Sequence, residues 1–96
     1  MDASNALKFT PQIVCLKKGG TITWDNTGNI PHTTTDEASL ASSPSDAVVP
    51  VGAKGWNHHL LAGKTWSHKF TVAGTYKYFC IPHETLGMVG TIKVVK

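Results

Sequence analysis

The length of 96 residues suits one small domain with a modest hydrophobic core, and we expect residues 1–96 to form it. Nine lysines against six acidic residues give a formal charge of +3, spread thinly along the chain. Because no basic run or interleaving of aromatic and basic residues is present, the charge does not predict a nucleic-acid partner. No apolar run approaches the roughly 20 residues of a membrane helix, so we expect a soluble chain without a membrane span.

Short apolar runs separated by Gly, Pro and Asn recur along the chain, which is typical of strands rather than helices. Near the N-terminus, alternation places Val14 and Leu16 on one face of a strand and Cys15 on the other. In the next run Ile22 and Trp24 share the apolar face. The pattern predicts an all-β sandwich of about seven to eight strands.

The middle of the chain has the weakest pattern. We expect residues 36–54 to cross the fold irregularly, with at most one short helical turn near residues 39–43. The adjacent His58 and His59 lie in an extended run, where neighbouring side chains point to opposite sides, so we expect surface residues that do not share a metal ion. Alternation makes His68 a partly buried histidine that needs a hydrogen-bond partner.

A strand that begins at Tyr76 leads into the stretch that carries most of the chemistry. Its Gly-x-Tyr opening resembles a tyrosine corner, in which the Tyr76 hydroxyl bonds back to the preceding backbone. Alternation directs Tyr76, Tyr78 and Cys80 inward and Phe79 outward. The last of the inward positions is a cysteine, which begins the candidate site.

A thiolate, an imidazole and a thioether follow one another in the order Cys80-x2-His83-x4-Met88. These donors together suit copper, and His32, held by the rigid Pro31 before it, is the best candidate for a second imidazole. Two His, one Cys and a weak axial Met form the trigonal site of blue-copper electron transfer. We therefore predict one copper ion, cycling between Cu(I) and Cu(II), on His32, Cys80, His83 and Met88.

Two other uses of these residues are less well supported. Zinc sites with a Cys-x2-His pair require further Cys or His ligands where this chain has Met88. A bridge between Cys15 and Cys80 would consume the sulfur that His83 and Met88 surround, so we predict that Cys15 is free.

The chain resembles plastocyanins, the small blue (type 1) copper proteins of the cupredoxin group, over most of its length. The motifs that carry the resemblance are Phe9-x-Pro11, Trp24-x-Asn26, Pro31-His32, Gly74-Thr75-Tyr76, Cys80-x-Pro82-His83 and Gly87-Met88-Val89-Gly90. The resemblance implies a Greek-key β-sandwich with copper near one end and an exposed His83 edge, framed by Pro31, Thr85, Leu86 and Gly87, as the docking surface.

Three departures from the plastocyanin pattern concern the surroundings of the copper site. Phe79 stands where the family commonly has the Tyr of a remote electron-entry patch. Thr33 replaces an Asn that ties the two ligand segments together, although its hydroxyl can take over that bond. Glu84 and Leu86 alter the rim around His83, which is where we expect the choice of partner to be determined.

The sequence thus predicts a one-electron shuttle and not an enzyme. Expected partners are redox proteins of the cytochrome, photosystem or oxidase type, met by a monomeric carrier. No signal sequence precedes Asp2, and we expect a mature chain of an extracytoplasmic compartment, either the bacterial periplasm or the thylakoid lumen. The alternatives are a copper-binding protein for storage or delivery and a copper domain cut from a larger oxidoreductase.

Overall fold

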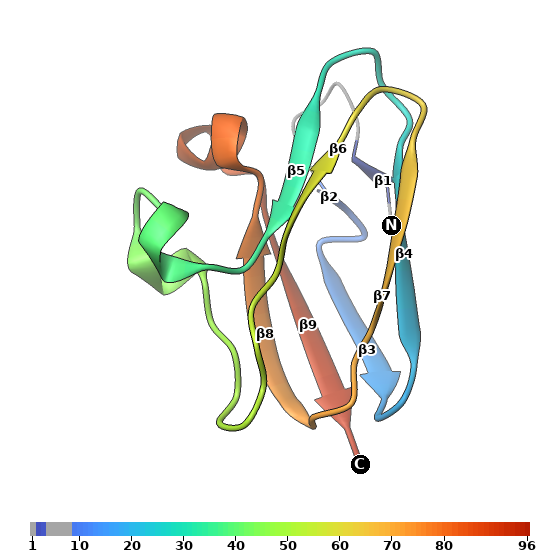
Figure 1. The fold of residues 1–96 in the computed structure, drawn as a ribbon, viewed down its shortest axis with the longest axis vertical. Helices are drawn as coiled ribbons and strands as arrows, with labels where there is room; N and C mark the ends of the chain where they lie inside the picture. Colours follow the sequence, from blue (N-terminus) through green and yellow to red (C-terminus); the bar gives the residue numbers. More distant parts are fainter. Residues whose placement is uncertain (1, 4–8) are drawn as a thin grey trace.

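Two β-sheets make up most of the computed structural model, which describes residues 2–3 and 9–96 (Figure 1). One sheet has the strand order β2-β1-β4-β7, with the bounds Phe9–Thr10, Asp2–Ala3, Thr21–Asn26 and Thr65–Lys69. The other has the order β3-β9-β8-β5-β6, with the bounds Ile13–Lys17, Val89–Val95, Gly74–Phe79, His32–Thr35 and Asn57–Leu60. The all-β sandwich predicted from the sequence is confirmed.

Within the described part of the chain, three short 3-10 helices interrupt the strands. η1 (Ala38–Leu40) and η2 (Pro44–Asp46) lie in the irregular crossing segment, where one turn was expected. η3 (Ile81–Leu86), with Pro82 in its first turn, was not expected and forms most of the loop between Cys80 and Met88. A proline there fits, because its missing N–H has no partner within the helix. None of the helices among the described residues has the length and apolar character needed to span a membrane.

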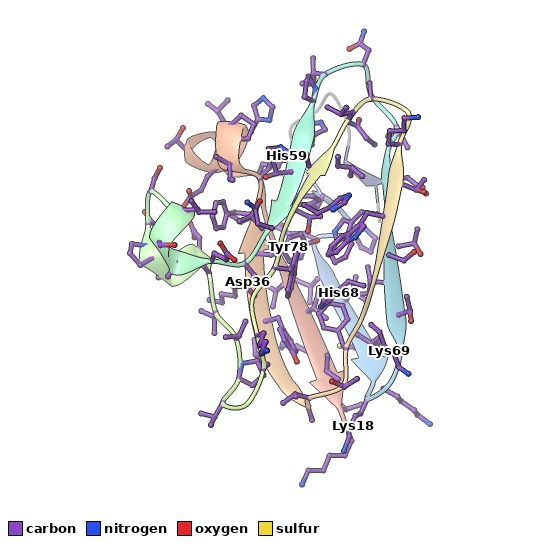
Figure 2. All side chains as sticks on the ribbon, in the orientation of Figure 1. Lys18, Asp36, His59, His68, Lys69 and Tyr78 are labelled. Atoms are coloured by element: carbon purple, nitrogen blue, oxygen red, sulfur yellow. The ribbon has the colours of Figure 1, made fainter. Side chains whose placement is uncertain are left out.

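The hydrophobic core lies between the sheets and is rich in aromatic rings (Figure 2). Ile22 and Trp24 are 6% and 0% exposed, as their alternation predicts. Val14 and Leu16 pack partly buried against the core, whereas Cys15 points to the exposed face. A period of two along β3 and β4 therefore identifies the inner face correctly.

Strand β8 opens with the predicted tyrosine corner, since the Tyr76 hydroxyl donates a 2.6 Å hydrogen bond to the carbonyl of Val72. Phe79 was expected to point outward, but it is 0% exposed, although it lies outside the main core cluster. η2 packs against β8, and a bridge between Val48 and Lys77 continues this contact. The crossing segment thus lies against β8, the strand that ends at Phe79.

The pairing of β5 with β8 creates the place for a site. Thr35 pairs with Phe79 in antiparallel register, so the start of β5 extends past the end of β8, toward η3. η3 lies beside β5 at the end of the molecule opposite the C-terminus (Figure 1). His32 therefore meets the loop that follows Cys80.

Candidate metal centre

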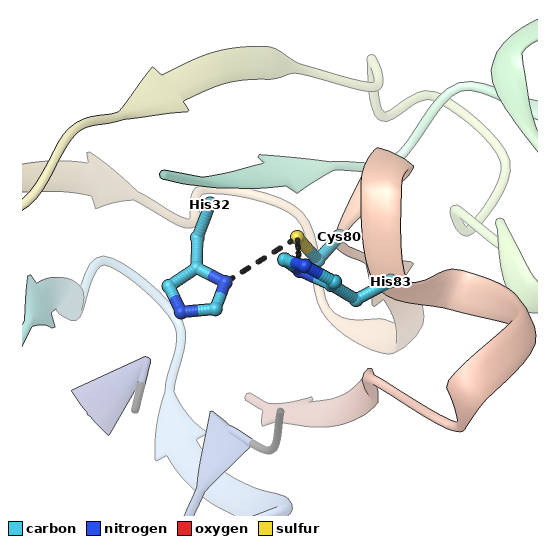
Figure 3. Close-up of side chains that lie close together, drawn as sticks. All are labelled: His32, Cys80 and His83. Carbon is cyan, nitrogen blue, oxygen red and sulfur yellow. Dashed lines mark hydrogen bonds between the residues drawn. The ribbon is translucent and has the colours of Figure 1, made fainter. Parts of the chain in front are cut away.

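Three donor atoms from the two ligand segments converge. The Nδ1 atoms of His32 and His83 lie 3.6 and 3.5 Å from Cys80 Sγ (Figure 3), and all three donor atoms are within 4.8 Å of one another. His32 and Cys80 are 1% and 0% exposed, and His83 is half-buried. The structure thus brings together the cysteine and both histidines predicted from the sequence.

Backbone hydrogen bonds hold Met88 next to Cys80 and His83. The carbonyl of Met88 accepts a 3.0 Å hydrogen bond from the N–H of Cys80, and its own N–H donates to the carbonyl of His83 at 3.3 Å. The turn before it requires Gly87, whose φ of 89° lies in the left-handed region that side chains disfavour. Because the Met88 side chain is fully buried beside this cluster, the fourth predicted residue also belongs to the site region.

Thr33 connects the two ligand segments in two ways. Its N–H points at Cys80 Sγ at 3.3 Å, and its Oγ1 accepts a 2.8 Å hydrogen bond from the N–H of Ile81. The threonine hydroxyl therefore takes over the tie expected of an asparagine. A hydroxyl chain continues from Thr33 Oγ1 to Thr35 Oγ1 at 3.0 Å and then to Asn57 Oδ1 at 2.9 Å. The sequence analysis missed Thr35 and Asn57, for which the only signal was a run of threonines after His32.

The environment of the thiol favours a bound soft cation over a free thiolate. Burial raises the pKa of Cys80, and hydrogen bonds from the backbone of Thr33 and His83 and from the Thr33 side chain offset this only in part. A metal ion must displace the thiol proton, and a buried set of sulfur and imidazole donors matches copper in softness. The residues present therefore fit the predicted ion.

Asn26 holds the approach to His32. Its side-chain amide donates to the carbonyls of Ile30 and Leu60, both at 2.8 Å, and its Oδ1 accepts from the N–H of Gly28 at 3.1 Å. This buried amide joins the loop that precedes His32 to the end of β6. Sequence analysis assigned Asn26 no role, although an Asn that begins a Gly-containing loop is a known turn signal.

Glu84 was expected on the rim around His83, but it is only 6% exposed and does not form part of that surface. Its carboxylate accepts hydrogen bonds from the N–H groups of Ser42 at 2.7 Å and Ser43 at 3.0 Å. Burial alone would raise the pKa of Glu84, but these bonds and one with the Asp46 side chain outweigh it and lower the pKa. The same bond to Glu84 is the main reason that the pKa of Asp46 is raised. Glu84 thus fastens the ligand loop to the crossing segment.

The surface around His83 is otherwise as predicted. Leu86 is 64% exposed, and Pro31, Thr85 and Gly87 are exposed as well. Ile81, at 37%, adds a further apolar side chain that the sequence analysis did not place there. The half-buried imidazole of His83 therefore lies among exposed, mostly uncharged residues.

The remaining cysteine and histidines lie elsewhere. Cys15 is exposed and both cysteines are free, as predicted. His59 is exposed, whereas His58 is half-buried and stacks on Trp66 at 4.6 Å between ring centroids. His68 is half-buried, as predicted, with its ring against those of Trp56, Trp66 and Phe70, and burial lowers its pKa.

A Greek-key sandwich that gathers two imidazoles and a thiol, with a methionine beside them, at one end defines the cupredoxin class. A family model described as copper binding proteins of the plastocyanin/azurin family matches residues 1–95. The chain belongs to the plastocyanin/azurin family of copper-binding proteins. As a plastocyanin-like cupredoxin it binds one copper ion, transfers electrons with redox proteins and is not an enzyme.

Individual relatives agree with this assignment. The plastocyanin of Scenedesmus fuscus is 41% identical over 92 residues, which cover 95% of this chain and 90% of that protein. The chloroplastic plastocyanin of Chlamydomonas reinhardtii is 39% identical over 93 residues, which cover 95% of this chain but 61% of that longer protein.

Solved structures of cupredoxins share the fold. The Cu(I) form of an amicyanin mutant superposes with a TM-score of 0.72 at 28% identity, covering 97% of this chain and 77% of that one. A purple cupredoxin from Nitrosopumilus maritimus gives a TM-score of 0.69 at 26% identity, covering 91% of this chain and 81% of the other.

Proposed function

We propose that His32, Cys80, His83 and Met88 are the ligands of the copper ion and that the chain carries single electrons between redox proteins. The observation that carries this proposal is the convergence of three donor atoms within 4.8 Å on a buried thiol. Copper supplies the one-electron couple, and the trigonal donor set with a weak axial thioether is the one that electron-transfer sites use.

Each proposed ligand has a distinct task. Cys80 provides the thiolate, whose charge is partly neutralised by the N–H of Thr33. His32, buried at the start of β5, fixes one side of the ion and keeps water away. His83, which is half-buried, offers the imidazole edge through which an electron leaves or enters. Met88, whose side chain is fully buried, would supply a thioether as the fourth donor.

The partners are expected to dock on the uncharged surface around His83. Exposed Leu86 and Ile81 there would lose water on contact with a complementary apolar patch. Cytochrome, photosystem or oxidase partners all fit a one-electron carrier of this kind. Both sheets contribute to one core, which supports a single domain. We propose that this domain acts as a monomer.

We propose that the protein acts in an extracytoplasmic space, either the bacterial periplasm or the thylakoid lumen. The free, exposed thiol of Cys15 does not itself favour an oxidising compartment, so this proposal rests on the relatives. The relatives from Tetradesmus obliquus and Chlamydomonas reinhardtii are described as chloroplastic plastocyanins, which supports the lumen as one of the two.

The test is titration of the metal-free protein with Cu(II), followed by optical spectroscopy. We expect an intense blue thiolate-to-copper band, which Cys80→Ser abolishes and the matched control Cys15→Ser retains. Reversible voltammetry of the blue form then measures electron transfer. Copper uptake without the blue band, or equal loss in both cysteine variants, would refute the ligand set and favour a delivery function.

A further inference from the structure

Aromatic rings form a continuous stack between the surface at β7 and the end of β8. The half-buried Trp66 lies 5.5 Å from Trp24 between ring centroids, with 21° between the ring planes. Trp24 in turn lies 5.4 Å from Tyr78 in an edge-to-face contact. Tyr78 precedes Cys80 by two residues, and both side chains are fully buried (Figure 2 labels Tyr78 within the core). We call Trp66, Trp24 and Tyr78 the aromatic stack.

The three tryptophans differ in their access to solvent. Trp24 and Trp56 are 0% and 6% exposed, whereas Trp66 is half-buried. Indole is among the most easily oxidised side chains, and an oxidant dissolved in water reaches Trp66 first. The outer end of the aromatic stack is therefore also its most accessible ring.

The surroundings of the inner rings favour onward transfer of the positive charge that an oxidised ring carries. The indole N–H of Trp24 lies near the Tyr78 hydroxyl, but neither buried atom completes a hydrogen bond within the described part of the chain. An oxidised indole loses oxidising power when its N–H proton leaves, and the group beside the Trp24 N–H is a phenol hydroxyl, which is a very weak base for that proton. Trp56 differs, because its N–H donates to Thr34 Oγ1 at 3.0 Å.

We propose that the aromatic stack is a route along which an electron moves from the copper–Cys80 centre to Trp66 after a strong one-electron oxidant has oxidised that indole. This inference rests on the copper ligation proposed above. The oxidant takes one electron from Trp66 and leaves its radical cation. One electron from the Cu(I)–thiolate centre then crosses Tyr78 and Trp24 and restores Trp66. The centre ends as Cu(II), no bond forms or breaks, and no proton is transferred.

Ring packing also stabilises the core, so stability data cannot test this route. Electron movement itself is measurable by pulse radiolysis of the Cu(I) protein with the azide radical, a one-electron oxidant of indoles. We expect the indole radical absorption to decay in a step whose rate is independent of protein concentration, with a matching rise of the blue band. Trp66→Phe should lose this coupled step while keeping an aromatic ring in the core.

Two further variants separate the route from general damage to the core. Trp24→Phe should leave the Trp66 radical in place but uncouple its decay from the rise of the blue band. The matched control Trp56→Phe removes another buried indole and should keep the coupled step. The inference is overturned if Trp66→Phe behaves as the unaltered protein does, or if the radical decays only by second-order reactions.

A chemical readout gives an independent check. After steady exposure to azide radicals, peptide mass mapping should find less oxidised Trp66 in the Cu(I) protein than in the metal-free protein. Trp24→Phe should remove that protection, and equal oxidation in both forms of the unaltered protein would contradict the route. Failure of the ligand proposal is distinct, because then no blue band forms on simple addition of Cu(II).

Discussion

The segments that supply the two proposed histidine ligands are held in different ways. All four residues of β5, from His32 to Thr35, are buried, and Asp36 extends this buried run. The loop from Cys80 to Met88 instead alternates between buried ligands and exposed residues such as Leu86. One half of the site is thus fixed inside the sheet, and the other half brings an imidazole to the surface.

The largest expected effect concerns Asp36, at the buried end of β5. Burial raises the pKa of this carboxyl from 3.8 to about 7. The folded state then binds this proton more tightly than the unfolded state does. The contribution of Asp36 to the free energy of unfolding is therefore greatest below pH 4 and is lost as the pH rises through 7. The loss is on the order of 4 kcal/mol at most. Chemical denaturation between pH 4 and 8 measures it.

The variant Asp36→Asn should flatten this part of the stability profile, since the amide does not titrate. Glu37→Gln, at the exposed neighbouring position, is the matched control and should leave the profile unchanged. Parallel profiles for Asp36→Asn and the unaltered protein would show that this carboxyl is not the cause.

A smaller effect is expected where the two segments are joined. Thr33→Val has nearly the same shape but leaves the N–H of Ile81 without its hydroxyl acceptor. We expect a loss of about 1–3 kcal/mol in the free energy of unfolding, together with a shifted blue band, because the tie sits beside Cys80. Thr33→Ser keeps a hydroxyl and should recover most of the stability and most of the original position of the blue band. If Thr33→Ser is as impaired as Thr33→Val, the hydroxyl bond does not join the two segments.

The smallest effect is expected on the loop side. Glu84→Ala removes the acceptor of the N–H groups of Ser42 and Ser43, but both residues are exposed and water can replace the carboxylate. We expect a loss of about 1 kcal/mol in thermal or denaturant unfolding. Glu84→Gln should lose less, since one amide oxygen still accepts. A loss larger than that of Thr33→Val would mean that the loop is held as firmly as the strand.

Patterns within the strands were predictable, and contacts made by irregular segments were not. Alternation placed Trp24, Tyr78 and Cys80 correctly, and donor chemistry identified His83 as a candidate ligand. The burial of Glu84 was missed, because the segment that binds it has no periodicity and its position depends on contacts with β8 and the ligand loop. The burial of Phe79 was missed because strict alternation along β8 assigns it to the outer face. The series of hydrogen bonds from Thr33 through Thr35 to Asn57 likewise joins residues that are far apart in the sequence and are brought together by the pairing of β5 with β6.

The position of β9 within its sheet determines when that sheet can be completed during synthesis of the protein. β9 lies between β3, with which it pairs in parallel, and β8, with which it pairs in antiparallel fashion. During synthesis the ribosome releases this internal strand after every other strand of its sheet. Such long-range pairing forms slowly compared with local contacts. The sheet beside Cys80 can therefore be completed only after β9 has been translated, so the contacts that frame the copper site form late in folding.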